Sequence, residues 1–434
     1  MEEIELNNDE LRNKTCNLDG DPKVGWLRNK NGLLLKTYGW LVKNAIGNIL
    51  LIHGYKVNTQ LTFMRTNLKT PTNNENLVIN SNNCYIYKDS WIENFNKNGY
   101  SVYALDLQGH GESQGWKNVR GDFSCFDDLV DDVLQYMNHI QDEISNDNQT
   151  IDKSHSIVTT KKKLPMYIIG YSMGGNIALR MLQVLRKEKE DRIKALNSNI
   201  YKNSNIILDN STNVNETEND MHNMNNANGY YSDNSCASSS ATKNGVAIDS
   251  DKDEGFYDCL DKFNIKGCVS LSGMIRIKSK LDPGNKSFKY FYLPLATFLS
   301  FVLPHIAISS ESRYKKSGYF ANISKHNIFR NINGKKYKTM SKFIKATITL
   351  DYNINYIPKD IPLLFVHSKD DSICSYEWAV SFYNKLNVND KEFHVVDGMK
   401  HDTTTKPGNE EILKKIINWI SNLRTNGEDE IEDK

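Results

Sequence analysis

The sequence lacks an excess of charge of either sign. Its 54 Lys and Arg residues are balanced by 53 Asp and Glu residues, which leaves a formal net charge of +1 over 434 residues. Proteins that bind nucleic acid through its phosphates usually carry a clear basic excess. We therefore expect no nucleic acid among the partners. The same balance gives no support for a general electrostatic attraction to anionic membranes.

Paired cysteines are also missing. The seven cysteines are scattered and none forms a CxxC pair, so neither a zinc ribbon nor a thioredoxin-like site is expected. Their odd number in a long chain argues against a disulfide framework. They are Cys16, Cys84, Cys125, Cys236, Cys259, Cys268 and Cys374. No P-loop and no cluster of metal ligands is visible, and the glycine-rich stretch 106–115 lacks the spacing of a dinucleotide site. We expect no cofactor and no metal.

Long apolar runs are absent. No run reaches the ~20 residues of a membrane-spanning helix. Residues 1–14 are too acidic and polar for a signal peptide, and position 2 is not the glycine that myristoylation needs. We therefore expect a reduced, cytoplasmic protein.

Short apolar runs alternate with helical patterns along most of the chain. Several runs are continuous, as expected for strands covered on both faces. Expected strands lie in 47–55, 99–109, 164–170, 266–273, 361–368 and 392–398, and expected helices in 126–140, 176–190, 376–386 and 410–423. This alternation predicts an α/β fold with a mostly parallel sheet and helices on both faces. Residues 25–40 predict an antiparallel hairpin with an Asn-Gly turn.

Three stretches interrupt the alternation. Residues 56–88 and 191–260 are polar insertions, and Asn makes up 13 of the 38 residues from 197 to 234. Such a segment buries too little apolar area to offset its ordering entropy, so we expect the second insertion to be disordered. A regulatory or partner-binding loop is the alternative reading.

The third stretch, residues 274–359, contains the uncharged run 290–304. This run is either a buried helix pair or part of a helical lid whose apolar face lines a pocket or touches lipid. We favour the lid, with transient membrane contact through it, because insertions between strands sit above the strand ends. The expected organisation is an extension (1–24), a core (25–273 and 360–424), the lid and an acidic tail (425–434).

The stretch Gly170-Tyr171-Ser172-Met173-Gly174 stands between an expected strand and an expected helix. That setting is the one a nucleophile elbow requires, with the serine hydroxyl exposed at the carboxyl end of the sheet. A tight turn that merely contains serine is the alternative. The helix that follows favours developing negative charge at its N-terminus. We therefore predict that Ser172 is a nucleophile.

A serine nucleophile needs a histidine base and an orienting carboxylate, in the chain order Ser, Asp or Glu, His. His401 lies in a loop just past the last expected strand and is the predicted base, whereas His394 lies inside that strand. Asp370 and Asp371, in the loop after strand 361–368, are both candidates for the acid.

The backbone amides of Met173 and Tyr55 are the predicted donors to the oxyanion. Tyr55 belongs to the turn after strand 47–55. We expect His53 to support this turn rather than to take part in catalysis.

The stretches 50–55, 104–115, 170–175, 367–375 and 397–402, in this order, resemble the α/β-hydrolases of the monoacylglycerol lipase and lysophospholipase family. The asparagine-rich insertions are similar to those of lysophospholipase-like esterases of malaria-type parasites. The resemblance implies an eight-stranded α/β-hydrolase sheet with a lid. It also implies that Asp371, nine residues after Pro362, is the catalytic acid. Tyr55 departs from the family, which often has glycine or alanine there.

The resemblance further implies a serine hydrolase without a cofactor. Its expected substrate is the ester of a single-acyl-chain lipid, a lysophospholipid or a monoacylglycerol. A short-chain carboxylesterase or acyl-thioesterase is the nearest alternative. A peptidase of the proline iminopeptidase kind and a non-catalytic binding protein with this fold are further alternatives.

Overall fold

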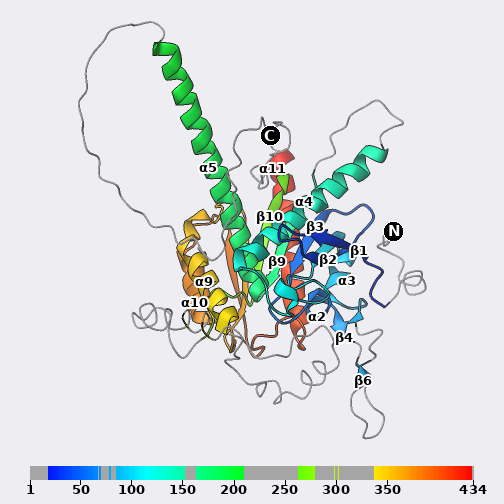
Figure 1. Cartoon of the computed structure of the whole chain (residues 1–434). Helices are drawn as coiled ribbons and strands as arrows, with labels where there is room; N and C mark the ends of the chain where they lie inside the picture. Colours follow the sequence, from blue (N-terminus) through cyan, green and yellow to red (C-terminus); the bar gives the residue numbers. More distant parts are fainter. Residues whose placement is uncertain are drawn as a thin grey trace.

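The computed structural model describes residues 18–66, 68–69, 78–79, 85–151, 163–209, 262–278, 298, 302 and 337–432 (Figure 1). Of the predicted insertion 191–260, residues 210–260 lie outside the described residues. Residues 191–209 are described and continue the helix that follows Ser172, so this part is not the disordered segment that was expected. Most of the predicted lid, including the uncharged run 290–304 apart from Phe298 and Val302, also lies outside the described residues.

A single eight-stranded sheet organises the described part of the chain. In spatial order its strands are β1 (Lys23–Arg28), β2 (Leu34–Trp40), β8 (Tyr100–Leu105), β3 (Gly47–Ile52), β9 (Met166–Tyr171), β10 (Ile265–Leu271), β11 (Leu363–Ser368) and β12 (Lys391–Val396). The pairs from β8 to β12 are parallel, whereas β1 and β2 form an antiparallel hairpin on the edge. The predicted mostly parallel sheet and its entry hairpin are both confirmed.

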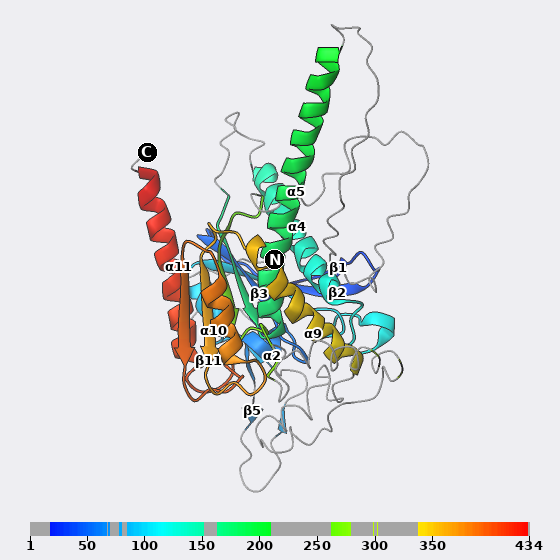
Figure 2. The same ribbon diagram turned by 90° about the vertical axis from the view of Figure 1, so that its left-hand side faces the viewer.

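Helices cover both faces of this sheet (Figure 2). The buried side chains of α4 (Phe126–Ile151), α5 (Met173–Asp209), α9 (Tyr337–Tyr352) and α10 (Tyr376–Lys385) pack into one core. Those of α3 (Trp91–Lys97) and α11 (Asn409–Glu432) pack into the other. Every residue of β3, β8 and β9 is buried, which explains why these strands are continuous apolar runs.

Some elements differ from the expectation. The predicted polar insertion 56–88 begins with a short buried helix, α2 (Thr59–Phe63), and contains two small hairpins. These pair β4 (Arg65–Thr66) with β7 (Tyr85–Ile86), and β5 (Leu68–Lys69) with β6 (Val78–Ile79). Helix α5 continues to Asp209, well past residue 190 where its pattern was expected to end. Its side chains from 191 to 197 are exposed, so helix propagation rather than packing extends it beyond its amphipathic part.

Within the predicted lid, α9 is the one α-helix that the structure describes in full. It packs against α4 and α5 through buried side chains that include Phe343, Ala346 and Leu350. Two single-turn 3-10 helices, η1 (Trp116–Asn118) and η6 (Ile354–Tyr356), complete the description.

Three cysteines bear on the expected redox state. Cys268 and Cys374 are buried and neither forms a disulfide. Cys125, in contrast, is disulfide-bonded, which departs from the expectation of a fully reduced chain.

In the part of the chain that the structure covers, no helix combines the length and the apolar character needed to cross a bilayer.

Candidate functional site

Ser172 occupies a strained turn between β9 and α5. Its φ of 56° lies in the left-handed region that non-glycine residues rarely adopt. The flanking glycines allow this turn to close. A Cβ on Gly170 would lie 2.2 Å from the carbonyl oxygen of Gly174, and one on Gly174 would lie 2.2 Å from that of Ile52. The predicted strand–turn–helix setting of Ser172 is therefore present.

The structure brings Ser172, His401 and Asp371 together. His401 Nε2 lies 2.8 Å from Ser172 Oγ, and His401 Nδ1 lies 2.7 Å from Asp371 Oδ2. Asp371 follows β11 and His401 follows β12, so parallel strands deliver all three residues to the carboxyl edge of the sheet. An ionised carboxylate only accepts hydrogen bonds, so Nδ1 donates to it and Nε2 is left to accept from the serine hydroxyl.

Asp371 is fully buried and held by several donors. Its Oδ1 accepts hydrogen bonds from the amides of Ile373 (2.8 Å) and Cys374 (2.9 Å), and His367 Nε2 lies 3.4 Å from Oδ2. Burial acts to raise the pKa of Asp371, but the hydrogen bonds from His367 and His401 outweigh it and hold the pKa well below its usual range. The carboxylate therefore stays ionised at neutral pH.

The second candidate acid has a different place. Asp370 is exposed, and its Oδ2 accepts a hydrogen bond from the amide of Gly398 at 3.0 Å. This bond joins the loop after β11 to the loop after β12. His394, the rejected candidate base, lies half-buried within β12, opposite Val366.

The turn after β3 passes directly beside the serine. A Cβ on Gly54 would lie 3.0 Å from Ser172 Cβ. His53 Nδ1 donates to the carbonyl oxygen of Gly54 at 2.7 Å, and its Nε2 accepts from the amide of Leu107 at 2.9 Å. Burial lowers the pKa of His53 to about 4, so the ring is neutral and holds this turn, as expected.

Ser172 is flanked by Tyr55, in the turn after β3, and by Met173, at the start of α5. Tyr55 continues the turn past Gly54. Met173 is the first residue of α5, and the amides of the first helical turn have no carbonyl partner within the helix. The positive end of the helix dipole therefore lies next to Ser172.

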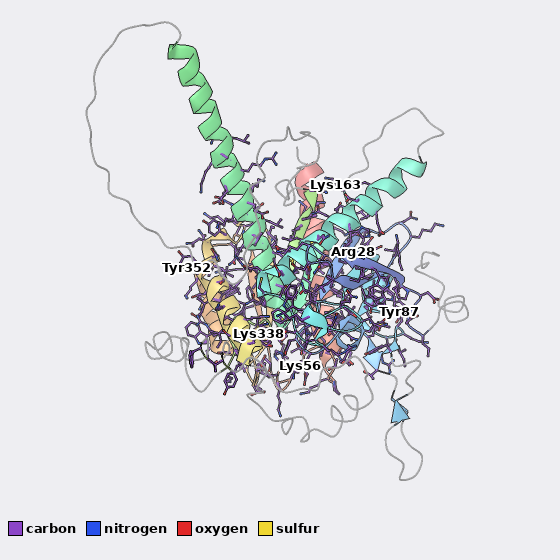
Figure 3. The ribbon with its side chains drawn as sticks, in the orientation of Figure 1. Arg28, Lys56, Tyr87, Lys163, Lys338 and Tyr352 are labelled. Atoms are coloured by element: carbon purple, nitrogen blue, oxygen red, sulfur yellow. The ribbon has the colours of Figure 1, made fainter. Side chains whose placement is uncertain are left out.

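One wall beside Tyr55 is aromatic. The ring of Phe343, on α9, meets the ring of Tyr55 edge-on with centroids 4.9 Å apart. Phe343 also stacks on Phe123 and meets Phe126 edge-on. Figure 3 places Lys56, which follows Tyr55, at the same end of the molecule as Lys338 of α9. Helix α9 thus contributes an apolar surface next to the predicted oxyanion turn.

Sequence reasoning missed the residues that hold His401 and Asp371 from behind. The amide of Thr403 donates to the carbonyl oxygen of His401 at 3.1 Å. Thr403 Oγ1 lies 2.9 Å from Ser272 Oγ, and both residues are buried. His367 stands in β11, four residues before Asp371, and the only signal for it is a histidine inside an otherwise apolar strand. Among the described residues, Asp371, Cys374 and His401 are the one group of three whose ligand atoms could share a metal ion.

Comparison with known proteins places the chain in a family. A model of the hydrolase family described as serine aminopeptidase, S33, matches residues 82–197 and 258–407, more than half of the chain. The chain belongs to this family. The matched ranges include Ser172, Asp371 and His401. No curated protein matches the chain.

Solved structures share the fold. A soluble variant of the monoglyceride lipase from Saccharomyces cerevisiae, in complex with a substrate analog, is 14% identical, with a TM-score of 0.54 over 93% of this chain and 95% of its own. A carboxyl esterase from Bacillus coagulans in complex with glycerol is 13% identical, with a TM-score of 0.51 over 93% and 98%. The predicted α/β-hydrolase fold is confirmed, whereas the similarity to parasite esterases stays a prediction.

Proposed function

We propose that the protein is a serine hydrolase that cleaves the ester of a single-acyl-chain lipid, a monoacylglycerol or a lysophospholipid. The observation that carries the proposal is the continuous hydrogen-bonded line from Ser172 Oγ through His401 to Asp371. Such a line is the requirement for activating a serine hydroxyl.

In this proposal Ser172 Oγ attacks the acyl carbonyl while His401 Nε2 takes its proton. Asp371 holds the ring with Nδ1 protonated and stabilises the imidazolium that forms. The amides of Met173 and Tyr55 bind the oxyanion. His401 then gives its proton to the leaving alcohol, and water activated by His401 releases the fatty acid from the acyl-enzyme.

The substrate class rests on the apolar surroundings of Tyr55. The buried rings of Phe343 and Phe123 pack on the Tyr55 side of the predicted oxyanion turn, which is an environment suited to an acyl chain rather than to a charged group. The fold is shared with a monoglyceride lipase and with a carboxyl esterase, so a short-chain esterase or an acyl-thioesterase is the nearest alternative.

Peptide hydrolysis is the second candidate, because the family's description names aminopeptidases. A free amine of the substrate would need a carboxylate partner. Asp122, which lies next to Phe123 of the aromatic wall, already faces Lys342 at 3.4 Å and Lys338 at 3.9 Å. This occupied carboxylate favours ester hydrolysis.

The test is product release from four substrates: a long-chain monoacylglycerol, a lysophosphatidylcholine, a short-chain ester and an aminoacyl anilide. Wild type is compared with Ser172→Ala and with Ser145→Ala, which changes a serine on α4 whose hydroxyl contacts the helix carbonyl of Gln141. We expect Ser172→Ala to lower turnover by about 10⁴- to 10⁶-fold and Ser145→Ala to leave it unchanged.

The outcomes separate the candidates. Preference for one long-chain lipid supports the proposal and identifies the head group. Equal or better turnover of the short ester means a general carboxylesterase, and release of the anilide alone means a peptidase. Turnover by Ser172→Ala within tenfold of wild type, or no labelling of wild type by a fluorophosphonate, rejects the serine mechanism.

A further inference from the structure

A cysteine lies beside the Asp371–His401 pair. One ligand atom from each of Asp371, Cys374 and His401 lies within 4.8 Å of the other two, and all three residues are buried. The proposed hydrolysis uses the aspartate and the histidine but not the thiol. The cluster therefore offers an oxygen, a nitrogen and a sulfur donor where the reaction needs only the first two.

This combination of donors suits a particular class of cation. Zinc-type cations bind thiolate sulfur at about 2.3 Å and imidazole nitrogen or carboxylate oxygen at about 2.0–2.2 Å. Hard cations such as Mg²⁺ and Ca²⁺ prefer oxygen ligands. Ligand atoms already within 4.8 Å of one another need only small shifts to share such a cation. The sulfur moves inward, whereas Nδ1 of His401 and Oδ2 of Asp371, now 2.7 Å apart, give up their hydrogen bond and move slightly apart.

The thiol is held in place by a rigid frame. The amide of Cys374 donates to Asp371 Oδ1, and Cys374 forms an antiparallel bridge with Ile277. The next residue, Ser375, donates its amide to the carbonyl oxygen of Arg276 at 2.8 Å. Because the backbone on both sides of the thiol is fixed, the entropy lost when a cation orders these ligands is small.

We propose that Asp371, Cys374 and His401 form an inhibitory binding site for a divalent cation of the zinc type. The cation binds the thiolate of Cys374, Nδ1 of His401 and a carboxylate oxygen of Asp371. The Nδ1 proton of His401 moves to Nε2, so the ring stays neutral, and the thiol proton leaves to water. One proton is therefore released for each cation bound.

The position of the His401 proton is the cause of inhibition. Without the cation, Nε2 accepts from Ser172 Oγ. With the cation on Nδ1, Nε2 carries the proton and can no longer take one from the serine. This inhibitory half of the proposal rests on the proposed function, whereas cation binding itself does not.

Cd²⁺ and Zn²⁺ are the probes. Cd²⁺ bound to a thiolate gives an ultraviolet charge-transfer band, which reports binding without any substrate. We expect this band in wild type, in Ser172→Ala and in Cys268→Ala. In Cys374→Ser we expect its absorbance to be lower by the contribution of one thiolate. Cys268 is the matched control because it is the other buried cysteine outside a disulfide among the described residues. Cys374→Ala provides a second substitution if the serine variant does not fold.

Hydrolysis is then measured against Zn²⁺ concentration, each variant relative to its own metal-free activity. We expect the half-inhibitory Zn²⁺ concentration to rise by about 10- to 100-fold in Cys374→Ser and to stay at the wild-type value in Cys268→Ala. Equal Cd²⁺ bands in wild type and in both Cys374 variants overturn the site. Bands that differ as expected, with equal sensitivity of hydrolysis to Zn²⁺, overturn the inhibition. A wild type that binds Cd²⁺ but hydrolyses nothing rejects the proposed function and leaves the cation site standing.

Discussion

The hydroxyl of Tyr171 donates a hydrogen bond to the carbonyl oxygen of His401 at 3.1 Å. The two rings also lie close, with centroids 5.5 Å apart. The residue directly before the proposed nucleophile thus holds the backbone of the proposed base, although 230 positions separate the two along the chain. This contact ties the end of β9 to the loop that follows β12.

Tyr171→Phe should slow the reaction without weakening substrate binding. The variant removes one buried hydrogen bond, which typically contributes about 1 kcal/mol, and leaves the ring in place. We expect kcat to fall by about 3- to 30-fold and KM to stay within twofold of wild type.

Tyr383→Phe is the matched control for this prediction. Its hydroxyl donates to the carbonyl oxygen of Lys391 at 3.0 Å, at the start of β12 and away from the carboxyl edge. The test is to measure kcat and KM of both variants on one ester by steady-state kinetics. An equal fall in kcat for the two would mean that Tyr171 acts on general stability alone.

His367 should act as a positioning residue for Asp371. Its Nε2 lies 3.4 Å from Asp371 Oδ2 and 3.4 Å from the carbonyl oxygen of Cys374. Both partners are acceptors, so Nε2 carries the proton and donates. We expect His367→Phe to lower kcat by on the order of tenfold at unchanged KM, and His367→Gln, which keeps a donor, to recover part of the loss.

His394→Gln is the control, because His394 lies in the neighbouring strand β12 and is half-buried. It should retain wild-type kcat. Identical kinetics of His367→Phe and wild type would show that the other donors to Asp371 suffice without His367.

Gly174→Ala should destabilise the fold. The added Cβ would lie 2.2 Å from the carbonyl oxygen of Ile52, a backbone atom at the end of the central strand β3 that cannot move aside. Overpacking of this kind typically costs about 1–3 kcal/mol. Gly39→Ala is the control, because its Cβ would meet side chains alone, the nearest at 3.5 Å. Thermal or urea unfolding should show a clear loss of stability for Gly174→Ala and little change for Gly39→Ala. Equal stability of the two variants would contradict the close approach of Gly174 to Ile52.

Acid should destabilise the protein in part through His53. Burial lowers the pKa of His53 from 6.5 to about 4. Between these pH values the unfolded chain binds a proton that the native chain does not, so stability falls as the pH falls from about 6.5 to about 4 and then levels off. The full effect is about 3 kcal/mol.

The comparison for this prediction is the change of unfolding free energy with pH in wild type and in His53→Gln. Titrating groups that do not interact with His53 cancel in the difference. The neighbouring His110, whose pKa is lowered mainly by burial and further by His53, leaves a smaller contribution. We expect the free energy of unfolding to change less with pH in His53→Gln than in wild type. Parallel slopes would mean that His53 is protonated equally in the native and unfolded chains.

Much of the core could be predicted from the sequence, because its signals are local. Continuous apolar runs marked β3, β8 and β9, and their buried faces follow from that pattern. The run around Ser172 carries its own strand, turn and helix. The presence of α3 and α9 was missed, because these helices depend on packing that a single stretch does not reveal. The end of α5 was missed because the helix propagates through a polar stretch whose side chains from 191 to 197 are exposed.

The sequence by itself determined which residues are candidates for the site, since Ser172, His401 and Asp371 each follow an expected strand. Asp371 was separated from Asp370 by resemblance, and the two differ in the structure because one carboxylate is buried against His401 and the other is exposed. Only the tertiary structure decided that Tyr171, His367, Thr403 and Cys374 surround the same pair. Their contacts arise where the ends of β9, β10, β11 and β12 meet. The distance between these strand ends is set by the pairing of the whole sheet rather than by any local pattern.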